Sequence, residues 1–433
     1  MKPPISWSGD IPIAEMFTSL LVEELPLRFT AYDGSASGPE DAPVGLHLKN
    51  ERGLAYILTA PQDQDLGIGR AYVSGDIDLT GAHPADPYPA LKLVQKGLKF
   101  RAPTPAEALA LLRGVGLRHF VPPAPPAQEH LPRWRRLAEG LRHTETRDAE
   151  SIHRHYDVSN RFYELVLGPS MTYTCAVFPR EDATLEEAQA NKYDLIARKL
   201  DLQSGQRLLD IGCGWGGMVR HAAREYGVQA LGVTLSREQA TWAQERIKKE
   251  GLDHLAEVRH LDYRHVEEGD FDALSSIGLT EHIGVANYPA YFGFIRDKLK
   301  PHGRLLNHCI TRRDNRPTAT GLFIDRYVFP DGEVTGSGRI ITEVQDAGLE
   351  VQHEENIRLH YARTLAGWCH NLQEHWDECV AEVGESTCRV WGLYMAGSRL
   401  GFERNELQLH HVLATKTDAE GAGGYPLRPQ FGV

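Results

Sequence analysis

The sequence lacks the features that would place it in a membrane, in an oxidising compartment or on nucleic acid. No apolar run approaches the ~20 residues that span a bilayer, and the first residues carry no signal-peptide pattern. The net charge of −12 argues against general nucleic-acid binding. The six cysteines show neither zinc spacing nor a dense disulfide framework; they stand at 175, 213, 309, 369, 379 and 388. We therefore expect a reduced, cytosolic protein with no metal site and no nucleic-acid partner.

The length indicates two domains, because 433 residues exceed one typical domain. A small α+β domain is expected over 1–120, with a helix at 13–25 and strands at 45–50, 54–60 and 69–81. Residues 121–143 are rich in proline and basic residues, which predicts a semi-rigid linker. The remaining residues, 144–433, form the second expected domain.

The second domain alternates short apolar strands with amphipathic helices. Strands are expected at "QRLLDIG", "QALGVTL", "AEVRHLDY", "FDALSSIG" and "GRLLNHCI", separated by helices such as "SREQATWAQERIKKEG", for which Ser236 is the expected N-cap. Short connections between alternating elements predict an α/β fold, a parallel sheet with helices on both faces. Residues 355–415 are expected to be largely helical.

Basic residues are concentrated between 92 and 142, where a local excess of seven positive charges stands in an acidic protein. Leu91, Leu98, Phe100 and Trp134 are interleaved with them. Such a stretch can lie on an anionic membrane surface, although a solvated helix face accounts for the charge equally well.

A glycine-rich turn, "LLDIGCGWGG", follows the first strand of the second domain and opens a helix. Glycines at this place let the backbone approach a ligand at the carboxyl edge of the sheet. Gly217 follows Gly214 by three residues, but the turn opens with Asp210 as D-x-G-x-G, and no phosphate-binding lysine follows. This favours a cofactor without a pyrophosphate over a dinucleotide; a purely structural turn is the other alternative.

The same pattern resembles motif I of the Rossmann-like, class I S-adenosylmethionine-dependent methyltransferases. The resemblance implies that Gly212 and Gly214 approach the methionine and ribose parts of S-adenosylmethionine, near Asp210. Thr234 and Gln239 stand where that family often has an acidic residue for the ribose, and Asp262 and Tyr263 are placed to bracket the adenine.

Four further segments together resemble the cyclopropane-fatty-acyl-phospholipid synthase family. They are "HYDVSNRFYELVLGPSMTYTCAVF" (155–178), "LTEHIGVANYPAYF" (279–292), "NHCI" (307–310) and "HYARTLAGW" (360–368). The chain looks most like an actinobacterial branch that converts oleoyl chains of phospholipids to 10-methylene stearoyl, the precursor of tuberculostearate. The resemblance implies methyl transfer to a cis double bond through a carbocation, and cyclopropane formation by the same mechanism is the alternative product.

A carbocation requires a dry site lined by π faces, since water would quench it and an aromatic face stabilises a cation. The motif segments contain candidate rings: Tyr156, Phe162, Tyr173, Phe178, Tyr288, Tyr291, Phe292, Tyr361 and Trp368. Each of these, taken alone, is as readily explained by core packing.

The resemblance also implies a bicarbonate ion as the catalytic base. Its expected ligands are Cys175, Glu281, His308, Ile310 through its backbone, and Tyr361, while Tyr173 and Thr174 are expected to touch the cofactor carboxylate. A buried anion beside a carboxylate needs several donors, which thiol, imidazole and phenol supply. Cys175 is accordingly expected to be a hydrogen-bond partner and not a nucleophile.

Several partners follow from this hypothesis. The protein is expected to be cytoplasmic and peripheral at the inner membrane face, on anionic phospholipid, with the N-terminal domain serving membrane docking or dimerisation. A methylene product would require a separate reductase. A methyltransferase for a small soluble nucleophile and an inactive lipid-binding protein are the remaining alternatives.

Overall fold

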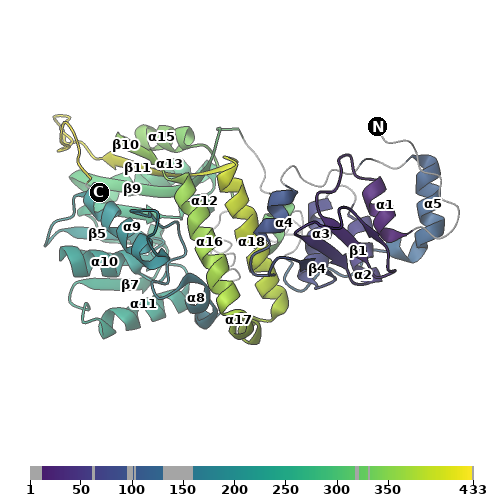
Figure 1. The fold of residues 1–433 in the computed structure, drawn as a ribbon. Coiled ribbons are helices and arrows are strands. Elements are labelled where there is room, and N and C mark those ends of the chain that lie inside the picture. Colours follow the sequence, from purple (N-terminus) through teal and green to yellow (C-terminus); the bar gives the residue numbers. More distant parts are fainter. Residues whose placement is uncertain are drawn as a thin grey trace. The chain divides into compact units, whose positions relative to one another are not determined.

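The computed structural model describes residues 12–60, 64–94, 101, 104–129, 159–316, 321–329 and 332–431. The chain divides into two compact units (Figure 1). Unit 1 consists of Met1–His130, Gly321–Val328 and Leu372–Leu400, and unit 2 of Leu131–Thr320, Phe329–Asn371 and Gly401–Val433. The division thus differs from continuous domains over 1–120 and 144–433, because two later segments belong to unit 1.

Unit 1 is built on a four-stranded sheet in the order β2-β1-β3-β4. Only the β1–β3 pair is parallel. Its elements are α1 (Ile13–Ser19), β1 (Arg28–Ala31), β2 (Ala36–Ser37), β3 (Gly45–Leu48), α2 (Glu51–Leu58), α3 (Gln64–Val73), β4 (Ile77–Thr80), α4 (Tyr88–Leu93), α5 (Pro105–Val115), a 3₁₀ turn (Leu117–Phe120), α14 (Leu322–Tyr327), α17 (Trp376–Val383) and α18 (Glu385–Glu403) as far as Leu400. Phe17 and Phe29 stack in its core with ring centroids 4.4 Å apart.

Of the expected strands of unit 1, the one at 54–60 is wrong and the one at 69–81 is confirmed only for its second half. Residues 54–60 lie mostly in α2, because Asn50 caps that helix by accepting a hydrogen bond from the Gly53 N–H. Residues 69–81 divide between the end of α3 and β4, and the helix expected at 13–25 ends at Ser19. The strand at 45–50 is confirmed as β3.

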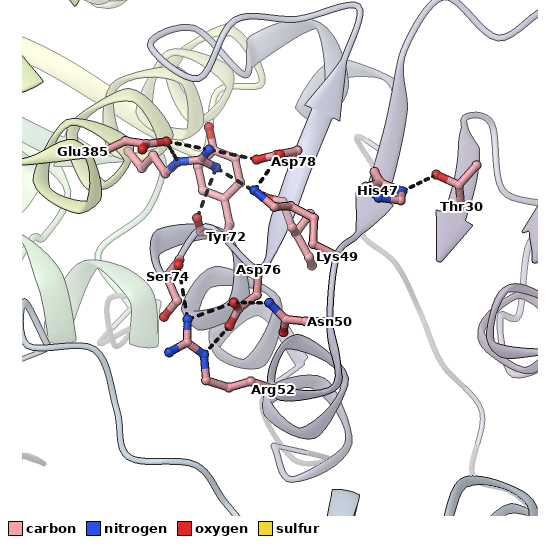
Figure 2. Close-up of polar contacts among 12 residues, drawn as sticks. Thr30, His47, Lys49, Asn50, Arg52, Tyr72, Ser74, Asp76, Asp78 and Glu385 are labelled. Atoms are coloured by element: carbon pink, nitrogen blue, oxygen red, sulfur yellow. Dashed lines mark hydrogen bonds and ion pairs between the residues drawn. The ribbon is translucent and has the colours of Figure 1, made fainter. Parts of the chain in front are cut away.

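Ion pairs and hydrogen bonds fix strand β4 and the residues that lead into it (Figure 2). The Asp76 carboxylate accepts hydrogen bonds from Asn50 and from the Arg52 guanidinium at 2.7–2.9 Å. Asp78 pairs with Lys49 at 2.9 Å and with Arg389 at 2.8 Å. Because each of these carboxylates is matched by a cation, the cluster is structural.

Unit 2 contains a seven-stranded sheet in the order β10-β11-β9-β8-β5-β6-β7. The strands are β5 (Arg207–Ile211), β6 (Gln229–Thr234), β7 (Ala256–His260), β8 (Phe271–Ile277), β9 (Leu299–Arg312), β10 (Glu350–Asn356) and β11 (Leu407–Thr415). The five strands from β9 to β7 are mutually parallel, as expected. Strands β11 and β10 add an antiparallel edge. Residues 355–415 are largely helical, as expected, and β11 follows the last of these helices.

The helices of unit 2 cover both faces of this sheet (Figure 1). They are α8 (Asn160–Leu167), α9 (Leu185–Leu200), α10 (Gly217–Tyr226), α11 (Arg237–Lys249), α12 (Thr280–Ile283), α13 (Tyr288–Lys298), α15 (Ser337–Asp346) and α16 (Arg358–Glu374), the last as far as Asn371, with 3₁₀ turns at Tyr263–His265 and Val285–Asn287. Ser236 is confirmed as the N-cap of α11.

Side-chain alternation along the strands separates the two faces. One core packs α9, α10 and α11 against Leu208, Leu306 and Leu413. The other core packs α13 and α15 against Leu209 and Leu305. Because side chains alternate along a strand, Asp210, His308 and His411 share the α9 face.

Candidate active site

The glycine turn lies directly after β5, at the carboxyl edge of the parallel strands. Gly212 and Gly214 have φ angles of +73° and +54°, the left-handed region that favours glycine. A Cβ added at Gly214 would have no neighbour within 4 Å, whereas one at Gly212 would contact Leu279. The turn therefore leaves open space beside Gly214, at the place where α/β sheets bind ligands.

We expect Gly214→Ala to weaken cofactor binding by at least tenfold, because it adds a methyl group where a ligand approaches the backbone. The matched control is Gly251→Ala, since Gly251 also has positive φ (+71°) and open space but lies at the end of α11. Both variants carry the backbone strain of roughly 1–2 kcal/mol. Calorimetric titration with S-adenosylhomocysteine checks this, and equal affinities of the two variants would contradict it.

The end of β6 supplies Thr234, beside the glycine turn. Its hydroxyl donates to Gln239 Oε1 at 2.8 Å, and both side chains are buried. The Gln239 N–H is held by the Ser236 hydroxyl at the start of α11. Thr234 and Gln239 therefore form one preorganised polar pair at the strand end, and their contact with the ribose stays a prediction.

Asp262 and Tyr263 follow β7 at the same edge. The Asp262 carboxylate is held by the Arg264 side chain at 2.6–2.8 Å and also accepts from the Arg264 backbone N–H. Desolvation opposes ionisation, but these contacts keep the pKa of Asp262 below its ordinary value. The Tyr263 ring packs edge-on against Tyr291 and Phe294, with centroids 5.3 and 5.2 Å away. Their contact with adenine stays a prediction.

Asp210 points into the α9 face, where it is 2% exposed. The Ser275 hydroxyl donates to its carboxylate at 2.6 Å. Burial raises the pKa of Asp210 to about 7, and the nearby cation of Lys192 opposes the rise. Lys192 is itself buried, donates to the Thr174 hydroxyl at 2.9 Å, and has its pKa lowered to about 7 by desolvation.

The segment Tyr173–Cys175 is fixed between α9 and α16. Gln189 donates to the Thr174 carbonyl at 3.0 Å, and the Ala176 N–H donates to the Thr364 hydroxyl at 2.9 Å. Since Thr364 lies one helical turn after Tyr361, this bond places Cys175 near that tyrosine. Burial raises the pKa of the Cys175 thiol far above its ordinary value, so the thiol stays protonated, as its expected role as a hydrogen-bond partner requires.

Aromatic rings join this segment to the glycine turn and to α16. The Tyr173 ring lies 6.0 Å from Tyr163 and 5.4 Å from Trp368, measured between centroids. Tyr163 in turn lies 4.8 Å from Trp215 of the turn, and Trp368 lies 6.1 Å from Tyr361. These rings form one continuous group at the site.

The other candidate rings, apart from Phe162, do not belong to this group. Tyr288, Tyr291 and Phe292 lie in the core of α13 and α15, on the sheet face opposite to His308, so they are packing residues. Phe178 stacks on His360, with centroids 6.2 Å apart. Phe162 is fully buried beside Tyr163, and Tyr156 lies outside the described residues.

Glu281 and Ile310 are in direct contact. The Ile310 N–H donates to Glu281 Oε1 at 2.6 Å. Because this N–H is already used, it would influence a bound ion by positioning the Glu281 carboxylate. The other oxygen, Oε2, is buried and has no hydrogen-bond partner among the described residues. Burial raises the pKa of Glu281 from 4.5 to about 7, against the effect of the Ile310 bond.

His308 lies two residues before Ile310 on β9 and is 1% exposed. Its Nδ1 lies 2.8 Å from Nε2 of His411, whereas its Nε2 is buried without a hydrogen-bond partner in the described part of the chain. Desolvation lowers the pKa of His308 well below its ordinary value, and Lys192 and Lys199 add to this effect. The imidazole is therefore neutral.

Lys192, Lys199, Ser275 and His411 were not predicted from the sequence. One signal was available for the lysines. They lie seven residues apart on α9, on the stripe that also contains the buried Gln189 and Ile196. A lysine on the apolar side of an amphipathic helix indicates a buried partner.

The fold and the glycine turn together define a class I S-adenosylmethionine-dependent methyltransferase. The chain matches the family model described as mycolic acid cyclopropane synthetase over residues 143–412, more than half of its length. It therefore belongs to that family, as the motif resemblance predicts.

Two relatives match over nearly the whole chain. A probable fatty acid methyltransferase of Mycobacterium tuberculosis is 62% identical over 418 residues, which cover 96% of this chain and 97% of the relative. A probable fatty acid methyltransferase of Pseudomonas putida is 38% identical over 419 residues, covering 96% and 98%.

Two solved structures resemble part of the chain. The cyclopropane synthase MmaA2 from Mycobacterium tuberculosis has a TM-score of 0.59 and 34% identity, covering 63% of this chain and 99% of that one. The mycolic acid cyclopropane synthase CmaA1, complexed with S-adenosylhomocysteine and CTAB, has a TM-score of 0.58 and 30% identity, covering 61% and 97%.

Proposed function

We propose that this protein methylates the cis double bond of an unsaturated acyl chain carried by a phospholipid, and that the product is a 10-methylene stearoyl chain. S-adenosylmethionine, when bound at the glycine turn, supplies the electrophilic methyl group. The fit of the site to this cofactor rests on the open space at Gly214 and on the polar pair of Thr234 and Gln239. Two relatives that match over nearly the whole chain are described as probable fatty acid methyltransferases.

One observation carries the proposed chemistry. Glu281 Oε2 and His308 Nε2 are both buried polar atoms without a partner among the described residues, and Glu281 is hydrogen-bonded to Ile310, two residues after His308 on β9. Because Oε1 of Glu281 accepts the Ile310 N–H, the proton of the neutral carboxyl is left on Oε2. Two buried polar groups without partners fit a bound small anion, since leaving them unpaired is costly.

Bicarbonate, when bound between these donors, supplies the base that removes a proton from the transferred methyl. Cys175 and Tyr361 complete the expected ligand set. Both lie near the hydrogen bond by which Ala176, directly after the segment Tyr173–Cys175, contacts Thr364 of α16. The rings of Tyr173, Tyr361 and Trp368 exclude water and present π faces to the cation. A hydride shift along the chain before the proton leaves gives the exocyclic methylene; ring closure onto the methyl gives cyclopropane.

The remaining parts of the proposal concern location and partners. No described helix is both long and apolar enough to cross a bilayer. In the proposal, the protein binds the membrane peripherally and the acyl chain reaches the site from there. The described basic residues of the stretch 92–142 are Lys92, Arg101, Arg113 and Arg118. Arg101 is paired with Glu107 and Arg118 with Glu51. The other basic residues of the stretch lie outside the described residues. Anionic membrane binding at the cytoplasmic face, a homodimer and a reductase for the methylene product are part of the same proposal.

The test is to incubate the purified protein with S-adenosylmethionine and dioleoyl phosphatidylglycerol vesicles and to fragment the lipids by mass spectrometry. We expect a gain of CH₂ with a fragmentation pattern of 10-methylene. The same mass gain with a cyclopropane pattern would support the alternative product. No gain despite bound cofactor would contradict the lipid substrate and favour a soluble one.

A further inference from the structure

A chain of buried polar side chains leads away from His308 on the α9 face of the sheet. His308, His411 and Glu355 stand directly opposite one another on the neighbouring strands β9, β11 and β10. Residues paired in this way point to the same face. Lys199 of α9 lies over this row, with its side chain only 1% exposed.

Three contacts connect the row. His308 Nδ1 lies 2.8 Å from His411 Nε2, His411 Nδ1 lies 2.9 Å from Lys199 Nζ, and Lys199 Nζ lies 2.5 Å from Glu355 Oε2. Both ring nitrogens of His411 are thus engaged, so turning its ring would break two contacts. The chain ends at Glu355, whose side chain is 40% exposed.

The direction of each hydrogen bond follows from Lys199. An ammonium group only donates, so His411 Nδ1 accepts and its proton is on Nε2. His411 Nε2–H then donates to His308 Nδ1, which leaves the proton of His308 on Nε2. Burial lowers the pKa of Lys199, and the Glu355 carboxylate opposes this shift. The charged form therefore depends on the contact with Glu355 and on the Phe431 ring, which lies 5.7 Å from Nζ.

We propose that Lys199, acting through His411, holds His308 in the tautomer that carries its proton on Nε2, and so makes His308 a fixed hydrogen-bond donor to the anion of the active site. Lys199 and His411 are positioning residues, since neither reaches the reacting atoms. The assignment rests on the proposed function only in naming bicarbonate as the anion; the tautomer follows from the contacts themselves.

Removing Lys199 should reverse the direction of the hydrogen bonds that join His411 and His308. In Lys199→Met, the Glu355 carboxylate remains opposite His411 and becomes the acceptor for a proton on His411 Nδ1. His411 Nε2 then accepts from His308 Nδ1–H, and His308 Nε2 loses its proton. The variant should bind bicarbonate roughly tenfold or more weakly, because one hydrogen-bond donor becomes an acceptor facing an anion. Lys199→Arg retains a cationic donor and should restore both properties.

The experiment is ¹⁵N NMR of the histidine side chains in the full-length protein, with resonances assigned through His308→Asn and His411→Asn. In the wild type, without cofactor or lipid, we expect His308 and His411 both neutral with the proton on Nε2. Lys199→Met should shift the His308 proton to Nδ1, whereas Lys300→Met, which removes a lysine paired with Asp272 at 2.7 Å, should not.

A proton on His308 Nδ1 in the wild type, or an unchanged tautomer in Lys199→Met, would overturn the assignment. Titration with ¹³C-bicarbonate provides the second readout. The expected tautomers without any bicarbonate binding would support the role of Lys199 and contradict the ion site of the proposed function, so the two failures are distinguishable.

Discussion

Replacing Glu281 by leucine should lower turnover by roughly 10²–10³-fold, whereas glutamine should preserve most of the turnover at neutral pH. The neutral carboxyl accepts the Ile310 N–H on Oε1 and offers a proton from Oε2. A glutamine side chain has the same arrangement of one acceptor and one donor. Leucine has neither, and it also leaves the Ile310 N–H without its partner.

The pH dependence of bicarbonate binding tests whether Glu281 acts as a hydrogen-bond donor. Because burial raises the pKa of Glu281 to about 7, the wild-type carboxyl loses its proton above neutral pH and repels a second anion. Bicarbonate affinity of the wild type should therefore fall by about tenfold per pH unit above this pKa, and that of Glu281→Gln should not. The measurement is ¹³C-bicarbonate titration between pH 6.5 and 9; parallel curves for the two proteins would contradict the donor role.

Stability should follow the same titration. The folded-state pKa lies above the ordinary 4.5, so the folded protein holds the proton more tightly than the unfolded chain does. This contribution is complete below about pH 4.5 and is lost as the pH rises to about 7, a difference of roughly 3 kcal/mol. The wild-type thermal midpoint should accordingly fall relative to that of Glu281→Gln between pH 5 and pH 8.

The order of elements in unit 2 was predictable because its strands are short apolar runs bounded by turn residues. The strand β5, the glycine turn and the Ser236 cap are all local features. Unit 1 was predicted less well, because the apolar run at 54–57 fits a buried strand as readily as a helix. Only the hydrogen bond from the Gly53 N–H to Asn50 shows that a helix begins there.

In the site, too, short motifs of the sequence indicated individual residues but not the contacts between residues far apart in the sequence. Motif resemblance named Glu281, His308 and Ile310, but the bond that joins Glu281 to Ile310 spans 29 residues. The row of His308, His411 and Glu355 depends on the register of β9, β11 and β10. That register is set by packing of the whole sheet, and no short segment of the sequence encodes it.

Tyr361 should be the ring on which turnover depends most strongly. It is 6% exposed, and its ring lies 4.6 Å from that of Phe402 and edge-on to Trp368. A desolvated cation–π contact contributes about 2 kcal/mol, which corresponds to roughly 30-fold in rate. We therefore expect Tyr361→Leu to lower turnover by about 30-fold or more.

Tyr361→Phe separates the ring from the hydroxyl. It keeps the π face and removes one expected ligand of the anion, so excess bicarbonate should restore its turnover but not that of Tyr361→Leu. The control for lost packing is Phe271→Leu, a buried ring of the opposite core at the start of β8, which should lower the thermal midpoint without changing turnover of the folded enzyme. Initial rates of methyl transfer at two bicarbonate concentrations measure all three variants. If Tyr361→Leu and Phe271→Leu lose turnover equally, the ring contributes packing alone; if bicarbonate restores both Tyr361 variants, its contribution is the hydroxyl.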